Sequence, residues 1–288
     1  MRRTLIAVAV VCQASGCGGC GCPEGVERGI DVTYYGWFVD GSTNLYVPGP
    51  RPQSFPIADG SPFVGCTELG DIRIFGNASI HEADFPAVVK MGDITGPPDD
   101  ADAPALLIDG FDELVEMGGI RGKILEVSGF DSVEALTELD GPKVVSGFGA
   151  LRKVVGNLHV EELAAGLGVE EIGGALRLKF GEGLLELPRL RDVGGDVVIV
   201  DTTYEHWSLP ALAHIGGSLY VSSNDQLSTW NGFADEVVID GDVIALGNPA
   251  IADEEIEVWL DSGEAEIGGE VCLCWNAGDQ TNCDCLDD

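Results

Sequence analysis

A short pattern of hydrophobic and polar residues recurs along this chain, each time after a glycine. In IGGSLYVSS (215–223), Leu219 and Val221 alternate with Ser218 and Tyr220. Successive side chains of a β-strand point to opposite faces, so a period of two predicts a strand with one buried face. A helix is excluded, because the apolar positions fall at i and i+2 instead of i and i+3 or i+4.

The same pattern is found in eight segments whose spacing is that of a repeat. The glycine nearest each predicted strand mostly recurs after 18 to 28 residues, and one interval of 37 residues leaves room for a degenerate coil near 140–147. A period in the low twenties indicates a solenoid. The segments are 68–76, 91–96, 154–162, 172–180, 193–201, 215–223, 239–247 and 267–275, with 117–127 as a looser member.

Counted from this glycine, positions +2 and +4 are apolar, and we expect them to point inward and to form two ladders through stacked coils. The glycine allows either a positive φ or a close approach between coils at the corner. A second apolar segment precedes many of the glycines, so each coil is predicted to carry two. The inward pairs are Ile72/Ile74, Leu158/Val160, Leu176/Leu178, Val197/Ile199, Leu219/Val221, Val243/Ala245 and Val271/Leu273.

The outward positions change character along the repeats. Positions +3 and +5 are charged in an earlier coil, as in Arg177 and Lys179, whereas three later coils carry mostly apolar residues there. A contiguous apolar patch that stays exposed often marks an interaction site. The sequence therefore predicts a binding stripe, with the alternative that a loop or the N-terminal segment covers it. The stripe consists of Val198, Val200, Tyr220, Ile244 and Leu246.

With these motifs, the chain over about 65–270 resembles the receptor L-domain family, a right-handed β-helix related to leucine-rich repeats. CTELGDIRI (66–74) is similar to the cysteine, glycine and aliphatic opening of such domains. The resemblance implies an all-β, right-handed parallel β-solenoid with terminal caps. It also implies a non-enzymatic recognition or surface role, but it carries over no ligand contacts, because only the structural repeat matches.

The first residues have the features of an export signal. Two arginines are followed by the apolar run 5–11 and by small residues up to Cys17. The apolar run is too short to span a bilayer as a helix. The tetrapeptide ending at Cys17 resembles the bacterial lipobox, which implies lipidation of Cys17 and a place in the outer membrane or at the cell surface. An ordinary secretory signal, giving a secreted protein, is the alternative.

Export also bears on the nine cysteines, because disulfides persist in oxidising compartments. Removal of Cys12 with the signal and lipidation of Cys17 would leave an odd number, so one thiol stays free, pairs between chains or belongs to another arrangement. Two disulfides near the C-terminus are expected, and a zinc site there is the alternative. The disulfide candidates are Cys20, Cys22, Cys66, Cys272, Cys274, Cys283 and Cys285.

These features divide the chain into four predicted regions. They are a signal peptide (1–16), a tether and aromatic N-terminal cap (17–64), the solenoid (65–270) and a Cys-rich C-terminal cap (271–288). Caps are expected because the open ends of a solenoid expose unpaired strand edges and core. Within the first cap, residues 29–48 predict a hairpin with its turn at 40–42.

The net charge of −34 excludes nucleic acid as a partner and limits membrane contact to the lipid anchor, because such a surface repels phosphates and anionic head groups. The charge serves solubility or, alternatively, the binding of divalent cations or basic partners. The four histidines are scattered, and no known catalytic or nucleotide-binding motif is present. No catalytic residue, metal site or cofactor is therefore predicted. The acidic loop 97–104 would need further oxygen ligands to bind calcium.

The sequence thus predicts an exported, lipid-anchored, non-enzymatic surface protein that presents a solenoid for recognition or adhesion. Its partner would be an extracellular or envelope protein or a glycan that the sequence does not identify. The alternatives are a passive structural envelope protein and a carbohydrate-active β-helix enzyme. Trp207, Trp230 and Trp259 are placed in loops, as lids on the core and not as ligand platforms.

Overall fold

A computed structural model describes most of the repeat region and a few N-terminal segments. The described residues are 9–13, 31–35, 71–75, 79–81, 88–96, 107–163, 167–230, 232–234, 236–277 and 283–286. The chain divides into two compact units, of which unit 1 contains residues 1–136 and 140–149 and unit 2 contains residues 137–139 and 150–288. The cysteines 17, 20, 22 and 66, the acidic loop 97–104 and the predicted turn at 40–42 lie outside the described residues.

Unit 1 consists of short strands. They are β1 (Ala9–Gln13), β2 (Asp31–Tyr35), β3 (Ile72–Phe75), β4 (Ser79–His81), β5 (Lys90–Met91), β6 (Ile94–Thr95), β7 (Leu107–Asp109), β8 (Glu116–Met117), β9 (Ile120–Val127) and β10 (Ala135–Leu136), while β11 (Leu139–Val145) extends over the boundary with unit 2. Parallel pairs join β2 to β3, β3 to β6, β6 to β9, β4 to β7, β7 to β9 and β5 to β8. Strand β11 occupies the position predicted for the degenerate coil.

Strand β1 lies within the segment predicted as an export signal and pairs with β2 in antiparallel fashion. Removal of residues 1–16 would therefore take away this neighbour of β2.

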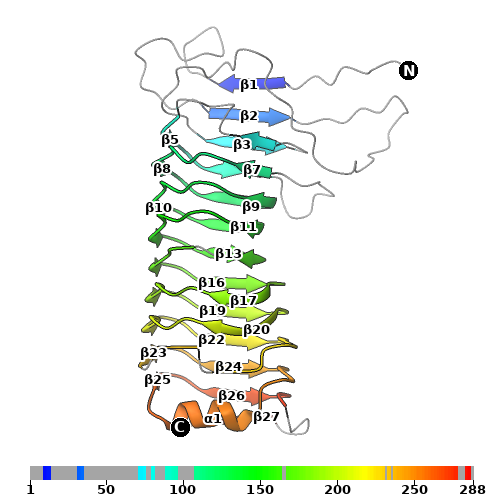
Figure 1. The fold of residues 1–288 in the computed structure, drawn as a ribbon, viewed down its shortest axis with the longest axis vertical. Coiled ribbons are helices and arrows are strands. Elements are labelled where there is room, and N and C mark those ends of the chain that lie inside the picture. Colours follow the sequence, from blue (N-terminus) through cyan, green and yellow to red (C-terminus); the bar gives the residue numbers. More distant parts are fainter. Residues whose placement is uncertain are drawn as a thin grey trace, which may run out of the picture. The chain divides into compact units, whose positions relative to one another are not determined.

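Unit 2 is a stack of coils in which each coil contributes strands to separate sheets (Figure 1). Its elements are β12 (Lys153–Val154), β13 (Leu158–Val160), β14 (Glu162–Leu163), β15 (Glu171–Ile172), β16 (Leu176–Lys179), β17 (Glu182–Glu186), β18 (Asp192–Val193), β19 (Val197–Val200), β20 (Thr203–Ser208), β21 (His214–Ile215), β22 (Leu219–Ser222), β23 (Val237–Ile239), β24 (Val243–Leu246), α1 (Asp253–Asp261), β25 (Ala265–Ile267), β26 (Val271–Cys274) and β27 (Cys283–Leu286).

Parallel pairing relates each coil of unit 2 to the next. One sheet runs in the order β13-β16-β19-β22-β24-β26, and a second runs β12-β15-β18-β21-β23-β25. A third parallel pair joins β17 and β20. The predicted all-β parallel β-solenoid is thus confirmed, with one helix among the described residues. At its C-terminal end β27 pairs with β26 in antiparallel fashion.

The core of the coils is built from the predicted inward positions. In unit 2, the +2 and +4 side chains from Leu158 to Ala245 are almost completely buried, and Leu273 is buried as well, whereas Val271 at the last coil is only partly buried. The second apolar segment of each coil is buried too, as the side chains of Leu187, Leu190 and Val193 show. Burial of each such side chain contributes about 1.5–3 kcal/mol.

The glycine pairs at the coil corners are required because the backbones of neighbouring coils approach each other closely there, and not because the glycines have a positive φ. None of the glycines 173, 174, 194, 195, 216 and 217 has a positive φ. A Cβ at Gly194 would overlap the carbonyl oxygen of Gly173 in the preceding coil, and a Cβ at Gly217 would overlap Oδ1 of Asp196. Of the two reasons that the sequence left open, crowding between coils is the correct one.

We therefore expect Gly194→Ala to lower the free energy of unfolding by about 2 kcal/mol, because a methyl group there forces two backbones apart. Gly247→Ala is the matched control. Gly247 has a positive φ of 62° but open space around it, so only backbone strain of about 1 kcal/mol is added. Denaturant unfolding of the two variants measures the difference, and an equal or smaller loss for Gly194→Ala would contradict the crowding.

Polar side chains at position +1, directly after the corner glycine, link the coils. Oδ1 of Asp196 accepts a hydrogen bond of 2.9 Å from the backbone N–H of Ser218, and Oγ of Ser218 accepts one of 2.9 Å from the N–H of Asp242. Oδ1 of Asp242 accepts the next, from the N–H of Glu270, at 2.9 Å. Each of these three +1 side chains therefore satisfies a backbone donor of the following coil.

A second polar column, which the sequence analysis missed, is buried at position +7. Asn224, Asn248 and Asn276 stack through consecutive coils and form what we call the Asn ladder. The Nδ2 group of each donates to a backbone carbonyl oxygen at 3.0 Å, namely that of Ile199, Val221 or Ala245. Thr202 begins the ladder by donating its N–H and its hydroxyl to Oδ1 of Asn224.

The residue before each position of the Asn ladder has a left-handed backbone conformation, and the chain turns there at the end of the strand. Its φ lies between 53° and 62° at Asp201, Ser223, Gly247 and Trp275. Positive φ is uncommon for residues other than glycine. The buried ladder therefore holds a corner that the local sequence does not favour.

Unit 1 has a corresponding aromatic column. The rings of Phe111, Phe130 and Phe148 stack with centroids 5.3 and 5.0 Å apart, and all three are buried. Each follows a glycine of positive φ and has a positive φ itself. A recurring Gly-Phe pair is thus the sequence signal of this column.

Helix α1 was not expected from the sequence, which placed Trp259 in a loop. Its first turn is acidic, which favours the helix dipole. Ile256 and Trp259 are its buried residues, and Oε1 of Glu255 accepts a hydrogen bond of 2.8 Å from the backbone N–H of Trp230. The helix is therefore fastened to the chain segment between β22 and β23.

Candidate functional site

The strongest candidate site is a groove on the outer face of β19, β22 and β24. It has a volume of about 370 Å³ and is lined mainly by side chains at positions +3 and +5. We call it the β19–β24 groove. Its lining residues are Arg177, Asp196, Val198, Val200, Tyr220, Ser222, Ile244 and Leu246.

Strand register brings these side chains together. Tyr220 lies opposite Val198 on one side and Ile244 on the other, and Ser222 likewise lies between Val200 and Leu246. The intervening residues of the three strands point into the core, so the two rows share the outer face. All five residues of the predicted binding stripe thus line one groove and are partly buried. Their role in binding stays a prediction.

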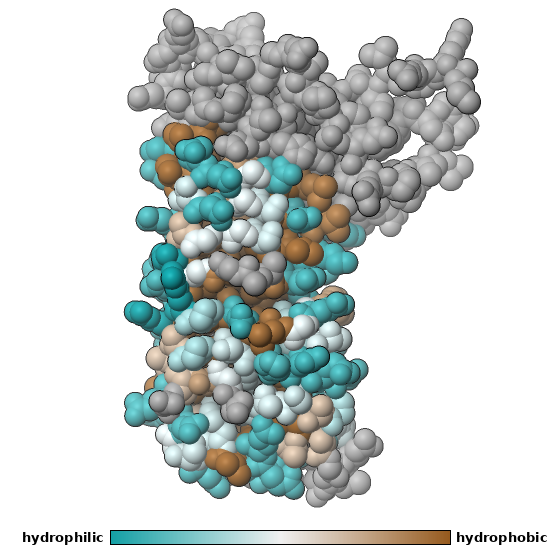
Figure 2. All heavy atoms as spheres, viewed as in Figure 1, coloured by the Kyte–Doolittle hydropathy of each residue, from teal (hydrophilic) through white to brown (hydrophobic). Residues whose placement is uncertain are grey.

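Exposed apolar side chains also occur elsewhere, so exposure alone does not mark this site. On the face shown in Figure 2, hydrophobic spheres form small groups among hydrophilic ones. Val155 and Val258 are more exposed than any residue of the stripe. Single exposed apolar residues are normal on protein surfaces. The β19–β24 groove differs because its apolar side chains are contiguous and line a hollow.

The edge of the groove at β16 carries its positive charge. Nζ of Lys179 lies 3.8 Å from Oδ2 of Asp201 and 4.6 Å from the ring centroid of Phe180. Arg177 is exposed and makes no ion pair with the described residues. At the opposite edge, Cys272 lies next to Ile244 in the strand register.

The charge distribution along the stretch of chain that forms the groove is a feature that the sequence analysis missed. Residues 192–288 contain 21 Asp and Glu residues and no Lys or Arg. All three strands of the groove fall in this stretch. The lack of Lys and Arg in residues 192–288 could be seen in the sequence. It becomes relevant to binding only because the apolar stripe lies within these residues.

Strands β26 and β27 bring the C-terminal cysteines into register. Cys272 lies opposite Cys285, and Cys274 lies opposite Cys283. Neither Cys272 nor Cys274 is a free thiol. Two disulfides at the C-terminal end stay a prediction, for which the sequence defines no pairing. Among the described residues, no group of three or more His, Cys, Asp and Glu side chains could hold a metal ion.

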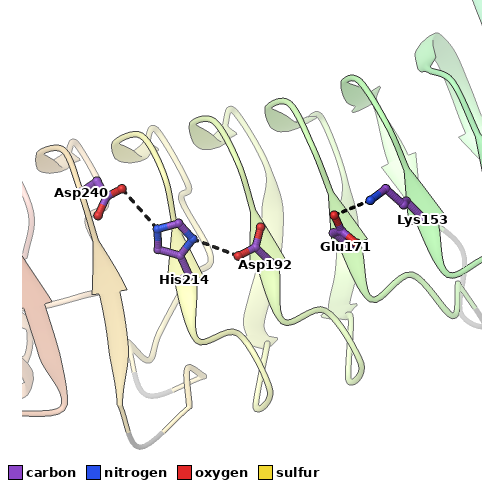
Figure 3. A network of polar contacts seen from close by, with 5 residues as sticks. All are labelled: Lys153, Glu171, Asp192, His214 and Asp240. Carbon is purple, nitrogen blue, oxygen red and sulfur yellow. Dashed lines mark hydrogen bonds and ion pairs between the residues drawn. The ribbon is translucent and has the colours of Figure 1, made fainter.

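A polar network crosses the second sheet and is the most prominent cluster of titratable groups (Figure 3). Nδ1 of His214 lies 2.9 Å from Oδ2 of Asp192, and its Nε2 lies 3.2 Å from Oδ2 of Asp240. Hydrogen bonds to these two carboxylates raise the pKa of His214 above its usual value of 6.5. In the neighbouring coils, Lys153 pairs with Glu171.

This network predicts a pH-dependent part of the stability. Because the folded pKa of His214 is raised, its contribution is fully present below pH 6.5 and is lost as the pH rises through the folded value. We expect His214→Gln to destabilise the protein more at pH 5.5 than at pH 8.5. Urea unfolding of both proteins at both pH values gives this difference. A cost that is constant with pH would contradict the assignment.

The three tryptophans singled out in the sequence form a buried cluster and not a ligand platform. Trp207 lies on β20, Trp259 lies on α1, and Trp230 lies in the loop between β22 and β23. All three are buried, and Phe233 completes the cluster, with its ring stacked 5.3 Å from that of Trp259. The expectation that they cover the core is confirmed, whereas the placement of Trp207 and Trp259 in loops was wrong.

Comparisons with known proteins do not add to these observations. No family model, no curated protein and no solved structure matches the chain. The resemblance to the receptor L-domain family therefore stays a prediction. Within the described part of the chain, no helix has the length and apolar character needed to cross a membrane.

Proposed function

We propose that this protein is a non-enzymatic recognition module that binds a partner through the β19–β24 groove. The observation that carries the proposal is the convergence of five partly buried apolar side chains from three strands on one hollow of about 370 Å³. Ligand sites are concave and mostly apolar, with a few polar groups for orientation. Arg177, Asp196 and Ser222 supply such groups here.

The proposal includes the location of the protein. Export, lipidation at Cys17 and attachment at the outer membrane or cell surface would present the groove to envelope or extracellular partners. The motif around Cys17 supports this part. Mass spectrometry of the mature N-terminus tests it, because a diacylglycerol-modified Cys17 and an unmodified N-terminus differ in mass.

A crosslinking experiment tests the groove itself. A photoreactive phenylalanine analogue is placed at position 220, and the matched control carries it at Val238, an exposed apolar residue of the other sheet. We expect a discrete adduct from position 220 in intact cell envelopes, none from position 238, and loss of the adduct when Ile244→Asp is added. Equal labelling from both positions would indicate a passive structural protein.

The charged substitutions must also leave the fold intact. Tyr220 and Ile244 are partly exposed, so Asp at either position remains hydrated, and we expect the thermal midpoint to fall by only a few degrees. Unfolding of either variant, seen by circular dichroism, would show that the stripe belongs to the core.

A further inference from the structure

We propose that the β19–β24 groove binds a basic amphipathic helix of a partner protein, whose apolar face packs on the stripe and whose Lys and Arg side chains face the surrounding carboxylates. This inference rests on the proposed function and names the class of partner. It is carried by charge complementarity and by the dimensions of the stripe.

The charge argument begins with the stretch of chain that forms the three strands of the groove. No Lys or Arg follows Arg191, and 21 acidic residues lie in that stretch. Asp196 lines the groove, and Asp242 lies two coils further in the same +1 column. These carboxylates use Oδ1 to accept a backbone N–H, and each keeps its negative charge and a second oxygen. Charge of this sign attracts basic partners and repels acidic ones.

The positive side chains near the groove do not reverse this preference. Lys179 is paired with Asp201, and Arg177 occupies only the edge at β16. Asp196 and Asp242 occupy the +1 positions just before β19 and β24, on the same face as the +3 row, so a partner that covers the stripe also meets these two carboxylates.

The dimensions of the stripe suit one helix. Three parallel strands at a spacing of about 4.8 Å make each row of the stripe roughly 10 Å long, which is about the rise of an α-helix from i to i+7 when its axis lies across the strands. The two rows of the stripe are two residues apart along the strands, or roughly 7 Å. An amphipathic helix offers apolar side chains at i, i+3, i+4 and i+7, which form such a narrow double row. Docking of a helix in an apolar groove is a common recognition mode.

Isothermal titration of the full chain with two designed peptides tests the proposal. The peptides share one length and one leucine stripe, and their polar positions carry Lys in one and Glu in the other. We expect the Lys peptide to bind at least 100-fold more tightly than the Glu peptide at low salt, and to weaken as salt is added because the charges are screened.

Two variants separate specific binding from general attraction to an acidic protein. Ile244→Asp adds a negative charge, so attraction by charge alone would keep or raise the affinity, whereas loss of apolar contact lowers it by at least 10-fold. The double variant Asp196→Asn, Asp242→Asn keeps both Oδ1 acceptors and removes two charges, and we expect a several-fold weaker complex with a smaller salt dependence. Val238→Asp is the control and should change nothing.

The other outcomes would overturn the inference in recognisable ways. Equal or tighter binding of the Glu peptide would point to an acidic partner held by Arg177. Binding of a neutral glycan panel, without the Lys peptide, would make the partner a carbohydrate. If position 220 gives a specific crosslink but the Lys peptide does not bind, this inference is wrong and the proposed function is not affected. If neither the crosslink nor the binding is observed, the inference and the proposed function are both wrong.

Discussion

Replacement of Trp230 by alanine lowers the free energy of unfolding by about 4 kcal/mol, the largest loss expected from any single substitution considered. The Trp230 side chain is 1% exposed. Its ring contacts that of Trp207 edge-on, at a centroid distance of 5.1 Å, and that of Trp259 at 5.9 Å. Alanine would leave a cavity that these rigid neighbours cannot fill.

Guanidinium unfolding measures this loss, and Trp275→Ala is the matched control. The side chain of Trp275 is 57% exposed, so its removal should cost less than about 1 kcal/mol. Because the ring of Trp230 contacts that of Trp259 on α1, hydrogen exchange in α1 should also accelerate in Trp230→Ala. Equal losses for the two tryptophan variants would contradict the buried cluster.

The second large effect is expected in the Asn ladder, where Asn248→Ala should lower the free energy of unfolding by about 3 kcal/mol. Oδ1 of Asn248 accepts from the N–H and from Nδ2 of Asn224, at 3.1 and 3.0 Å. Its Nδ2 donates to the carbonyl oxygen of Val221 and to Oδ1 of Asn276, both at 3.0 Å. Alanine removes the acceptor of the buried N–H of Asn224 and takes one hydrogen bond from each of the three other groups, and a buried group left unpaired costs about 1–3 kcal/mol.

A control for this prediction is Asn157→Ala, at a +1 position. Oδ1 of Asn157 accepts one hydrogen bond of 2.9 Å, from the N–H of Ala175, near the surface. Water can replace that bond, so the loss should stay below about 1 kcal/mol. Denaturant midpoints of both variants provide the comparison. A loss for Asn248→Ala as small as that for Asn157→Ala would mean that the ladder contributes little.

The inward ladders could be predicted from the sequence because alternation is a local property. Leu219 and Val221 lie two residues apart, and their spacing alone defines the buried face. The binding stripe could be predicted from the same alternation, because Tyr220 lies between Leu219 and Val221 and points to the opposite face of the strand. The register then brought residues of three coils to one groove, as parallel stacking requires.

The Asn ladder and helix α1 could not be predicted in this way. The hydrogen-bond partners of Asn224 lie 22 to 25 residues away, and an asparagine after a strand is equally typical of a solvated turn. Helix α1 offers only two buried residues, Ile256 and Trp259, three positions apart. Their contacts lie in other coils, so the helical period was too short to recognise.

The hydrogen bonds of the corner glycines would allow a further coil to be inserted into the solenoid. The N–H of Gly195 donates to the carbonyl oxygen of Gly174 at 3.0 Å, and the N–H of Gly241 donates to that of Gly217 at the same distance. The corner glycine of a coil thus offers its carbonyl oxygen as a hydrogen-bond acceptor to the next coil, just as the previous coil does for it. An internal duplication of one coil would restore every such bond and widen the groove by one strand.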